Sequence, residues 1–537
     1  MRSKVLLLSL LAAVAARHPE APTHSKLRNL PPINAAEFTA DYWYNEARAA
    51  IEKRSKRDPD QNVARNLIMF LGDGMSIPTL AAARALKGQK LDRTGEEEEL
   101  FFESFPGLGL AKTYCVNQQI ADSACTATAY LCGVKNNYGT TGVTAAVSRR
   151  NCEASLLETN RVESIAEWAL AAGKDVGIVT TTRVTHASPS GVYAKSADRH
   201  WENDAEIISD SNDPERCVDI ARQLIQMNPG QQLKVILGGG RREFLPNTTF
   251  DDEGGQGFRT DGQNLIEQWQ QDKSDRDLSH DYVWNRDQLM NHFDSPPEYL
   301  LGLFENSHMQ YHLEANATTE PTLEEMTEIA IKMLSRNEKG FFLFVEGGRI
   351  DHAHHDNYVH IALDETLQFE KAVEKAAGIL PEDDTLIVVT ADHAHVMAYN
   401  GYTARGSPIY GLSDEKDTDG MPYMTISYTN GPGARTQVNG IRDDIRQDGN
   451  FGENRWRAHV EFPLEDETHG GDDVAVFARG PHYRLFAGLY EQSQIPHVMA
   501  YVGCIGPGPH APGCNAATTL HVTGLVLLLS VVKLILL

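Results

Sequence analysis

Residues with metal-binding side chains follow four apolar runs of this sequence. After the runs Leu67–Leu71, Val176–Thr181, Phe341–Val345 and Leu386–Thr390 come Asp73, His186, Ser188, Glu346, Asp392 and His393. If the runs are parallel strands, these side chains gather outside the carboxyl ends of the sheet, where α/β proteins bind ligands. Asp73 alone would be read as a turn residue, but the joint arrangement predicts a metal site.

A second group of candidate ligands lies in the segment Asp351–His355. Asp351 and His355 are four residues apart, so a helix places both on one face, which is a common way to hold zinc. His354 points elsewhere on such a helix and is expected to be structural. His469 lies in a glycine-rich stretch before an apolar run and is the candidate for a third zinc ligand.

Ser123 is the candidate nucleophile, in the segment Asp122–Ala127. A serine at the start of a helix lies near free backbone N–H groups and the positive end of the helix dipole, which favours an anionic oxygen and a phosphate. The alternative is an ordinary helix cap, which is the commoner role of such a serine. The segment has no G-x-S-x-G motif, and the chain has no phosphate-binding G-x-x-x-x-G-K-[ST] loop.

Elements that would position these residues alternate along the chain. Further strands are predicted at Val235–Leu237 and Val474–Phe477. Helices are predicted at Ile77–Lys87, Thr126–Leu131, Glu163–Ala171, Leu323–Leu334 and Ile361–Ala377. Continuous apolar strands between helices predict an α/β fold, a three-layer α/β/α sandwich with a central, mostly parallel sheet.

The segments 243–320 and 400–466 are rich in glycine and charged residues and show little periodicity. Both are predicted to be surface insertions, the second crown-like, in a single catalytic domain that spans 17–515. An amphipathic helix is predicted at Tyr42–Lys53, within an N-terminal arm of about residues 40–54.

The net charge excludes one class of partner. The 537 residues carry a formal charge of −25, so the surface repels nucleic acid. It also repels anionic substrates at long range. A site for a phosphate would therefore need its own positive charge, and bound metal ions are the usual source.

Both ends of the sequence indicate secretion. Met1–Ala16 has a basic start, an apolar middle and an A-x-A cleavage site, which is typical of a signal peptide; a short membrane anchor is the alternative. The apolar tail Leu525–Leu537 follows a polar spacer and the small residues Asn515–Ala517. This order predicts attachment of a GPI lipid at Asn515, removal of 516–537, and a place on the extracellular face of the cell membrane; the alternative is a soluble protein that keeps a weakly apolar tail.

An oxidising compartment favours disulfides among the seven cysteines. Cys504 and Cys514 flank a Gly/Pro-rich loop and are predicted to pair, and Cys152 and Cys217 are plausible partners. The pairing of Cys115, Cys125 and Cys132 stays open. Asn247 and Asn316 each begin an N-x-T sequon and are predicted glycosylation sites.

Long strings of this sequence resemble the animal, GPI-anchored alkaline phosphatases, over about residues 40–515. The strings are Phe70–Met75, Asp122-Ser123 with Thr126–Ala129, Thr180–Pro189, Phe341–His355, Thr390–Val396 and Glu467–Pro481. The resemblance implies a homodimer that binds two zinc ions and one magnesium ion and hydrolyses phosphate monoesters of many kinds.

The resemblance also assigns the ligands of each metal. The first zinc ion would be held by Asp351, His355 and His469. The second would be held by Asp73, Asp392 and His393, completed by Ser123. The magnesium ion would be held by Asp73, Ser188 and Glu346.

Other residues take supporting roles by the same resemblance. Arg199, in Asp198–Trp201, matches the arginine that grips the phosphate, although its spacing alone would leave it a surface arginine. His186 matches a residue near the magnesium ion and His395 one near the first zinc ion. Apart from the resemblance, Asp122 and His352 are expected to support the ligands, His352 through water.

A calcium-type site is known in mammalian members. Phe304 and Glu305 match part of it, Glu320 stands where the pattern has an aspartate, and a further ligand would come from near Asp251–Glu253. Ala124 and Cys125 depart from the mammalian pattern of Gly and Ala. Cys125 would either pack or form a bridge to Cys115.

The mechanism that the resemblance implies has two displacements. Ser123 would attack phosphorus and form a phosphoserine, and a hydroxide held by zinc would then release inorganic phosphate. The alternatives are a phosphodiesterase or sulfatase of the same superfamily, and a surface receptor on an inactive scaffold.

Overall fold

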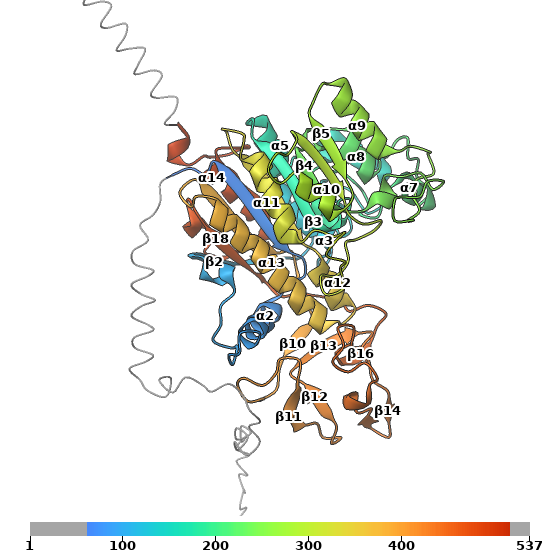
Figure 1. Ribbon diagram of the computed structural model, residues 1–537, viewed down its shortest axis with the longest axis vertical. Helices are drawn as coiled ribbons and strands as arrows, with labels where there is room; N and C mark the ends of the chain where they lie inside the picture. Colours follow the sequence, from blue (N-terminus) through green and yellow to red (C-terminus); the bar gives the residue numbers. More distant parts are fainter. Residues whose placement is uncertain (1–61, 516–537) are drawn as a thin grey trace, which may run out of the picture.

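The computed structural model describes residues 62–515, so the predicted signal peptide, the arm at Tyr42–Lys53 and the tail after Asn515 lie outside the described residues. Within the described range, ten strands form one sheet in the order β19-β2-β18-β8-β1-β7-β3-β4-β6-β5 (Figure 1). Their bounds are β1 Asn66–Gly72, β2 Gly107–Lys112, β3 Asp175–Arg183, β4 Val235–Gly239, β5 His280–Val283, β6 Tyr299–Leu303, β7 Phe341–Gly347, β8 Thr385–Ala391, β18 Val474–Arg479 and β19 Gly488–Glu491.

The central strands run parallel, as predicted. The neighbours from β8 through β5 pair in parallel, whereas β18 is antiparallel to both β8 and β2. Each of the six strands predicted from apolar runs is present within one or two residues of its expected bounds. Each is an apolar run of the kind that both faces of a covered parallel sheet require.

Helices cover the sheet. In Figure 1, α11 and α13 cross in front of it, and α2 packs against α13; α3, α5 and α14 pack against one another, and α5 and α14 contact the central strands. The helices are α2 Ile77–Gln89, α3 Ser123–Cys132, α4 Cys152–Ser155, α5 Ile165–Ala171, α6 Ala187–Ser190, α7 Asp204–Ser209, α8 Ile220–Gln226, α9 Leu265–Asp275, α10 Arg286–Asn291, α11 Leu323–Leu334, α12 Arg349–His355, α13 Val359–Ile379 and α14 Ile495–Gly503. The three-layer α/β/α architecture is confirmed.

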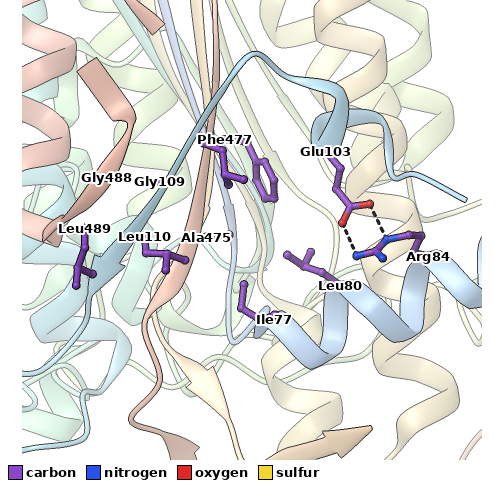
Figure 2. Close-up of a pocket in the computed structure, with 11 residues that line it drawn as sticks. Ile77, Leu80, Arg84, Glu103, Gly109, Leu110, Ala475, Phe477, Gly488 and Leu489 are labelled. Carbon is purple, nitrogen blue, oxygen red and sulfur yellow. Dashed lines mark hydrogen bonds and ion pairs between the residues drawn. The ribbon is translucent and has the colours of Figure 1, made fainter. Parts of the chain in front are cut away.

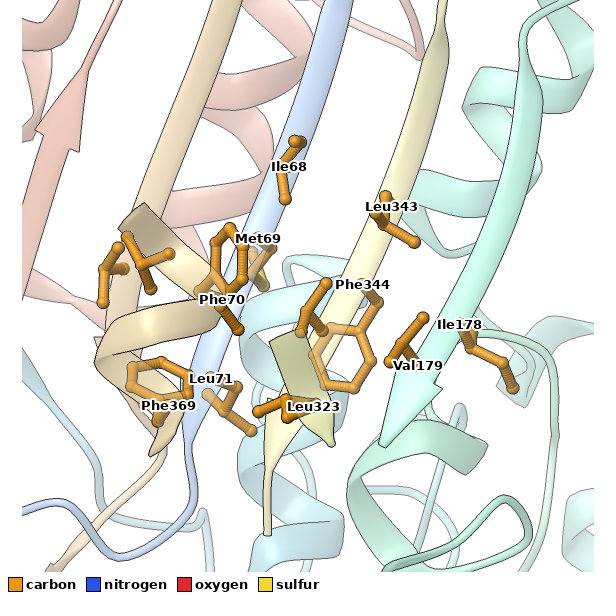
Figure 3. Packing of buried hydrophobic residues seen from close by; sticks show 14 of the residues in the cluster. Ile68, Met69, Phe70, Leu71, Ile178, Val179, Leu323, Leu343, Phe344 and Phe369 are labelled. Carbon is orange, nitrogen blue, oxygen red and sulfur yellow. The ribbon is translucent and has the colours of Figure 1, made fainter. Parts of the chain in front are cut away.

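The core lies between the central strands and these helices. Figure 3 shows Phe70 of β1 facing Phe369 of α13, and their ring centroids lie 6.0 Å apart with the rings nearly perpendicular. Phe344 of β7 and Leu71 of β1 are fully buried in the same cluster. Burial of large side chains on both sides of β1 and β7 holds the carboxyl ends of these strands in register.

The prediction that 243–320 is a surface insertion needs correction. This segment contributes α9 and α10, and also β5 and β6, which extend the main sheet beyond β4. β6 is a fully buried apolar strand, but polar and glycine-rich stretches on either side obscure its signal. β5 is an edge strand in which only the last residue is buried, so it lacks an apolar run.

The segment 400–466, together with the preceding strand β10, forms small sheets separate from the main one, visible at the lower end of Figure 1. One sheet has the order β10-β13-β16, and β11 pairs with β12 and β14 with β15. Their bounds are β10 Met397–Tyr399, β11 Leu412–Lys416, β12 Pro422–Met424, β13 Ile426–Gly431, β14 Gln437–Val438, β15 Ile441–Arg442 and β16 Val460–Pro463. Among residues 62–515, no helix is both long and apolar enough to cross a membrane.

Three disulfides join the described residues. They link Cys152 to Cys217, Cys504 to Cys514, and Cys115 to Cys125. The first two are as predicted, and the third decides the question about Cys125 in favour of a bridge. Cys132 is buried and carries a free thiol.

A mainly apolar groove of about 530 Å³ lies where the N-terminal part of α2 meets β2, β18 and β19 (Figure 2). Leu110 and Leu489 line it, and the ion pair between Arg84 and Glu103 closes one side. None of the predicted site residues lines this groove, so the candidate site lies elsewhere in the molecule.

Candidate metal centre and active site

The carboxyl ends of β1, β7 and β8 bring predicted ligands together. In the parallel register, Leu71 of β1 pairs with both Glu346 of β7 and Thr390 of β8. Asp73 and Asp392 therefore leave neighbouring strands at the same edge of the sheet. Asp73, Glu346 and Asp392 are each fully buried there.

The first set of ligands comprises Asp351 and His355 of α12 and His469 of β17 (His469–Gly470). The Nε2 atoms of the two histidines lie 3.1 Å apart. Carboxylate oxygens of Asp351 lie 3.4 Å from each of these Nε2 atoms. The helix and the loop strand thus deliver three ligand atoms to one point, as a zinc ion requires.

Main-chain carbonyls orient both rings of this set. Nδ1 of His355 lies 2.5 Å from the carbonyl oxygen of Glu467, and Nδ1 of His469 lies 2.7 Å from that of Ala121. A carbonyl only accepts, so each Nδ1 carries a proton, and each ring in its neutral form presents a lone pair at Nε2. Two lone pairs that face each other beside a carboxylate need a cation between them.

His395, on the short strand β9 (Ala394–His395), supports the first set from behind. Its Nε2 lies 2.6 Å from Asp351 and its Nδ1 lies 2.5 Å from the carboxylate of Glu467. Burial opposes a charged ring, but the two carboxylates raise the pKa of His395 to about 10. The ring therefore donates to both acids and fixes the orientation of Asp351.

The second set comprises Asp73, Asp392, His393 and Ser123. Nε2 of His393 lies 3.0 Å from Asp392, 3.5 Å from Asp73 and 3.3 Å from Oγ of Ser123. The other oxygen of Asp392 accepts from the backbone N–H groups of Gly74 and His393, at 2.9 and 2.8 Å. These bonds hold Asp392 in place and leave its second oxygen facing His393.

The third set comprises Asp73, Ser188 of α6 and Glu346. Oγ of Ser188 lies 3.4 Å from Asp73 Oδ2, and Oε2 of Glu346 accepts from the hydroxyls of Thr180 and Thr182. Oxygen ligands of this kind are the ones that magnesium prefers. Asp73 belongs to both the second and the third sets.

Electrostatics show that these residues fit metal ions. Burial, followed by the charges of Asp392 and Asp351, holds the pKa of Asp73 well above its usual range, and burial raises the pKa of Glu346 to about 7. Asp73 Oδ1, Glu346 Oε1 and His393 Nδ1 are buried without a hydrogen-bond partner among the described residues. Buried acids without partners are costly unless a cation neutralises them.

Ser123 is the first residue of α3, but it is not the helix cap. Asp122 is the cap and accepts from the backbone N–H groups of Ala124 and Cys125, at 3.3 Å each. The hydroxyl of Ser123 is consequently released from capping and points to His393. This arrangement distinguishes Ser123 from the ordinary cap serine, and the side chain lies beside the second set at a helix N-terminus.

Arg199 lies on a loop, and its guanidinium contacts Asp122, the residue next to Ser123. Its Nη1 donates to Asp122 Oδ2 over 3.1 Å, and its Nη2 lies 3.2 Å from Nε2 of His186. The carboxylate of Asp122 thus joins the cap of α3 to the guanidinium. Arg199 and Ser123 converge because both are tied to this one residue.

His352 lies farther from the ligands. Its Nδ1 is 2.8 Å from Nη1 of Arg349, and its ring packs against those of His186 and His308 at 5.4 and 4.3 Å. Burial holds the pKa of His352 well below its usual range. His354 is structural, because it bonds to Thr79 and to the hydroxyl of Tyr428.

The residues expected for a calcium-type site gather near β6. Phe304 is buried, and both oxygens of Glu320 lie 3.1 Å from the backbone nitrogen of Gln310, whose side chain donates to Glu305. Burial, a hydrogen bond to Glu305 and nearby acidic charge raise the pKa of Glu320 to about 9. Asp251 and Glu253 form ion pairs with Arg241 instead.

Two residues of the site carry no sequence signal of their own. Glu467 binds His395 and contacts His355 through its carbonyl, but its role depends on the pairing of β9 with β17, which brings His395 opposite His469. His308 joins the imidazole cluster of His186 and His352 from the loop after β6. Glu467 lies two residues before His469, and that proximity is the one clue available.

The fold and the three ligand sets define an α/β enzyme that depends on metal ions. The family model of alkaline phosphatase matches residues 64–505. The chain belongs to the alkaline phosphatase family.

Relatives support this assignment along most of the chain. The membrane-bound alkaline phosphatase of Bombyx mori is 60% identical over 500 residues, which cover 92% of this chain and 90% of the relative. The tissue-nonspecific isozyme of Homo sapiens is 46% identical over 486 residues, covering 89% of this chain and 91% of the relative. Hydrolysis of phosphate monoesters follows as the activity of this chain.

Solved structures agree on the fold. The alkaline phosphatase of Thermus thermophilus superposes with a TM-score of 0.58 at 23% identity, and the match covers 85% of this chain and 94% of that one. A mutant of the TAB5 enzyme, described with magnesium bound in its M3 site, superposes with the same TM-score at 20% identity, over 83% of this chain and 100% of that one.

Proposed function

We propose that the hydrolysis of phosphate monoesters by this chain proceeds through a phosphoserine on Ser123. One observation carries this proposal: Oγ of Ser123, which Asp122 relieves of capping, lies 3.3 Å from His393 in the middle of a buried set of metal ligands. A side chain that is 1% exposed in such a place is suited to nucleophilic attack on a bound phosphate.

The first and second sets would each hold one zinc ion, and the third would hold one magnesium ion. Histidine and carboxylate ligands favour zinc, whereas the all-oxygen third set favours magnesium. When bound, the zinc ions would lower the pKa of the Ser123 hydroxyl and offset negative charge on the leaving oxygen, and the magnesium ion would balance the buried acids.

The residues of the chain define the order of bond changes. Ser123 Oγ gives up its proton to solvent and forms a bond to phosphorus as the bond from phosphorus to the alcohol oxygen breaks, and the alcohol oxygen takes a proton from solvent. Water then adds to phosphorus and loses a proton, the bond to Ser123 breaks, Oγ regains a proton, and inorganic phosphate is released. Both displacements use the same serine, so the phosphoryl group never leaves the site as a free species.

Arg199 would hold the phosphate through both steps. Asp122 and His186 fix its guanidinium, which is a planar fork that suits two phosphate oxygens. The ligand sets and Arg199 would all bind the phosphate group, and no residue is assigned to bind the alcohol. We therefore expect broad acceptance of monoesters and poor turnover of diesters, whose second ester group would occupy one of the oxygens that Arg199 binds.

Trapping of the intermediate tests the proposed nucleophile. Acid quenching of the enzyme with radiolabelled phosphate monoester should yield a labelled protein, and the label should map to Ser123. The Ser123→Ala variant should carry no label while it retains zinc. A labelled Ser123→Ala protein would overturn the assignment.

Further expectations concern the rest of the chain. Glu305, Glu320 and the carbonyl of Phe304 would hold a calcium ion, whose charge would displace the proton that Glu320 otherwise keeps. Asn247 and Asn316 are exposed and would carry glycans. A GPI lipid at Asn515 would place a homodimer on the outer face of the cell membrane, and release by a phosphatidylinositol-specific phospholipase would test that lipid.

A further inference from the structure

The Cys115–Cys125 disulfide lies beside the nucleophile and is not explained by the reaction itself. Cys125 is two residues after Ser123 in α3, and Cys115 begins the loop 115–122 that leads into this helix. Both cysteines are only 2% exposed and pack with Ala121. The bond therefore ties the start of the loop to the helix that carries Ser123.

The middle of this loop has little else to hold it. Residues 116–120 are exposed, including Val116 at 56% and Ile120 at 41%. Val116 donates its N–H to the carbonyl of Asn136, and Asn117 accepts from the N–H of Tyr138. Within the loop, Gln118 donates its N–H to the carbonyl of Cys115 over 3.4 Å. A loop with two bonds to the rest of the chain and little buried surface depends on its covalent link for a fixed path.

The end of the loop reaches two parts of the active site. The carbonyl of Ala121 accepts from Nδ1 of His469, over 2.7 Å. The carboxylate of Asp122 accepts from Arg199 over 3.1 Å and from the backbone N–H of Gly139 over 2.9 Å. The carbonyl of Gly139 in turn accepts from the backbone N–H of Arg199, over 2.9 Å.

We propose that the Cys115–Cys125 disulfide is a positioning element of the catalytic site: it fixes loop 115–122 so that Asp122 aims the Arg199 guanidinium at the phosphate. The proposal rests on the proposed role of Arg199. The carboxylate of Asp122 accepts from Ala124, Cys125, Gly139 and Arg199, so a shift of the loop would misalign the guanidinium directly. The cysteines are positioning residues, since neither touches the substrate.

The chain contains a matched control for this bond. The Cys504–Cys514 disulfide also closes a loop with a sequence separation of 10, but it lies after α14, away from the ligand sets. Loop closure should therefore contribute to stability to a similar extent for both bonds. A kinetic difference between the two variants would report on position rather than on stability.

The test compares Cys115→Ser/Cys125→Ala with Cys504→Ser/Cys514→Ala. In the first variant, the inhibition constant of inorganic phosphate and the KM for a monoester should each rise about tenfold, equivalent to about 1.4 kcal/mol. Both constants should stay at the wild-type values in the second. Both variants should be assayed at saturating zinc, because the loop contacts the first ligand set through the bond from His469 to the carbonyl of Ala121. Equal phosphate inhibition in the two variants would show that the bond contributes to stability only, and would overturn the proposal.

A double-mutant cycle separates this inference from the proposed function. In an Arg199→Ala background, loss of the Cys115–Cys125 bond should have no further effect on phosphate inhibition, whereas independent, additive losses would contradict the route through Asp122. If Arg199→Ala alone leaves phosphate inhibition unchanged, the role of Arg199 fails instead. Should the double cysteine variant not accumulate as folded protein, Cys115→Ser breaks the same bond and keeps the Cys125 side chain in α3.

Discussion

His355 and His469 face each other with their Nε2 atoms 3.1 Å apart, and each donates its Nδ1 proton to a main-chain carbonyl. When both rings are neutral, neither Nε2 atom can donate to the other. The contact then needs a positive charge beside the two rings and Asp351, either a metal ion or a second proton on His355, whose pKa Asp351 raises against the effect of burial.

Removal of metal should lower the stability of the folded chain. Without cations, the facing lone pairs of neutral His355 and His469 repel, and Asp73 and Glu346, whose pKa values burial raises, must take up protons or remain charged at a cost. A chelator that strips zinc should lower Tm by several degrees, roughly 2–4 °C for each kcal/mol lost in a large domain. Readdition of zinc should restore the original Tm. An unchanged Tm after verified removal of zinc would contradict this account.

Arg199→Ala should weaken inhibition by phosphate. Loss of a charge-assisted, two-pronged contact costs about 1.5–3 kcal/mol, which corresponds to about ten- to a hundredfold in affinity. Zinc content should not change, because Arg199 belongs to none of the ligand sets. The control is Arg446→Ala, since Arg446 is an exposed arginine that pairs with Asp444 alone. Wild-type inhibition in the Arg199 variant would disprove its role as the phosphate clamp.

Glu467→Gln should weaken the binding of zinc. The carboxylate of Glu467 accepts from Nδ1 of His395 and from the backbone N–H of Val396. A neutral glutamine would hold the charged ring of His395 less firmly, and His395 would in turn orient Asp351 less firmly. Supporting residues of this kind typically change metal affinity by about 10–100-fold. Titration with buffered zinc measures the effect. Glu465→Gln, two residues earlier and exposed, is the matched control and should bind zinc as the wild type does.

Calcium should stabilise the chain through Glu320. The pKa of about 9 means that Glu320 keeps a proton at neutral pH beside Glu305. Binding of calcium should release about one proton and raise Tm by an amount that grows with calcium concentration. Glu320→Gln should abolish the rise in Tm. If the glutamine variant responds to calcium as the wild type does, the cation binds somewhere else.

His360 should make stability depend on pH. Burial lowers its pKa to about 4 from 6.5, so the unfolded chain binds the proton more tightly than the folded chain. The contribution is fully present above pH 6.5 and is lost as pH falls toward 4; by pH 5.5 the loss is about 1 kcal/mol.

The His360→Phe variant isolates this effect, because phenylalanine retains the packing on Tyr410, whose ring lies 3.9 Å away. The difference in Tm between the His360→Phe variant and the wild type should shift in favour of the variant when the pH is lowered from 7.5 to 5.5. The exposed His497 provides the mutational control, as His497→Phe. A wild-type pH response in the His360 variant would exclude this histidine as the source.

The elements found from sequence alone share one physical property. β1, β3, β7 and β8 are buried on both faces, so each is an uninterrupted apolar run, and the ligands that follow are polar residues in an otherwise apolar context. β2 and β19 lack such a run and could not be predicted in this way. β2 alternates buried and exposed residues through Gly107-Leu108-Gly109, and β19 is an edge strand with no fully buried residue.

Arg199 and Glu467 could not be found by spacing, because their roles arise from contacts between distant segments. Arg199 contacts Asp122, 77 residues away, and Glu467 contacts His395, 72 residues away. For Arg199, resemblance to a family supplied what periodicity could not. Ligands that follow strands are predictable because the sheet places them, whereas residues that orient ligands are placed by loops.

Asp73 contacts residues of both the second and the third sets. If each of these proposed sets holds a cation, the loading of the two metals would be a coupled equilibrium, because either cation would favour the ionised form of Asp73, to which the other also binds. By linkage, the effect of one cation on the affinity of the other would be the same in both directions. One carboxylate at the end of β1 would thereby make the occupancy of each site depend on that of its neighbour.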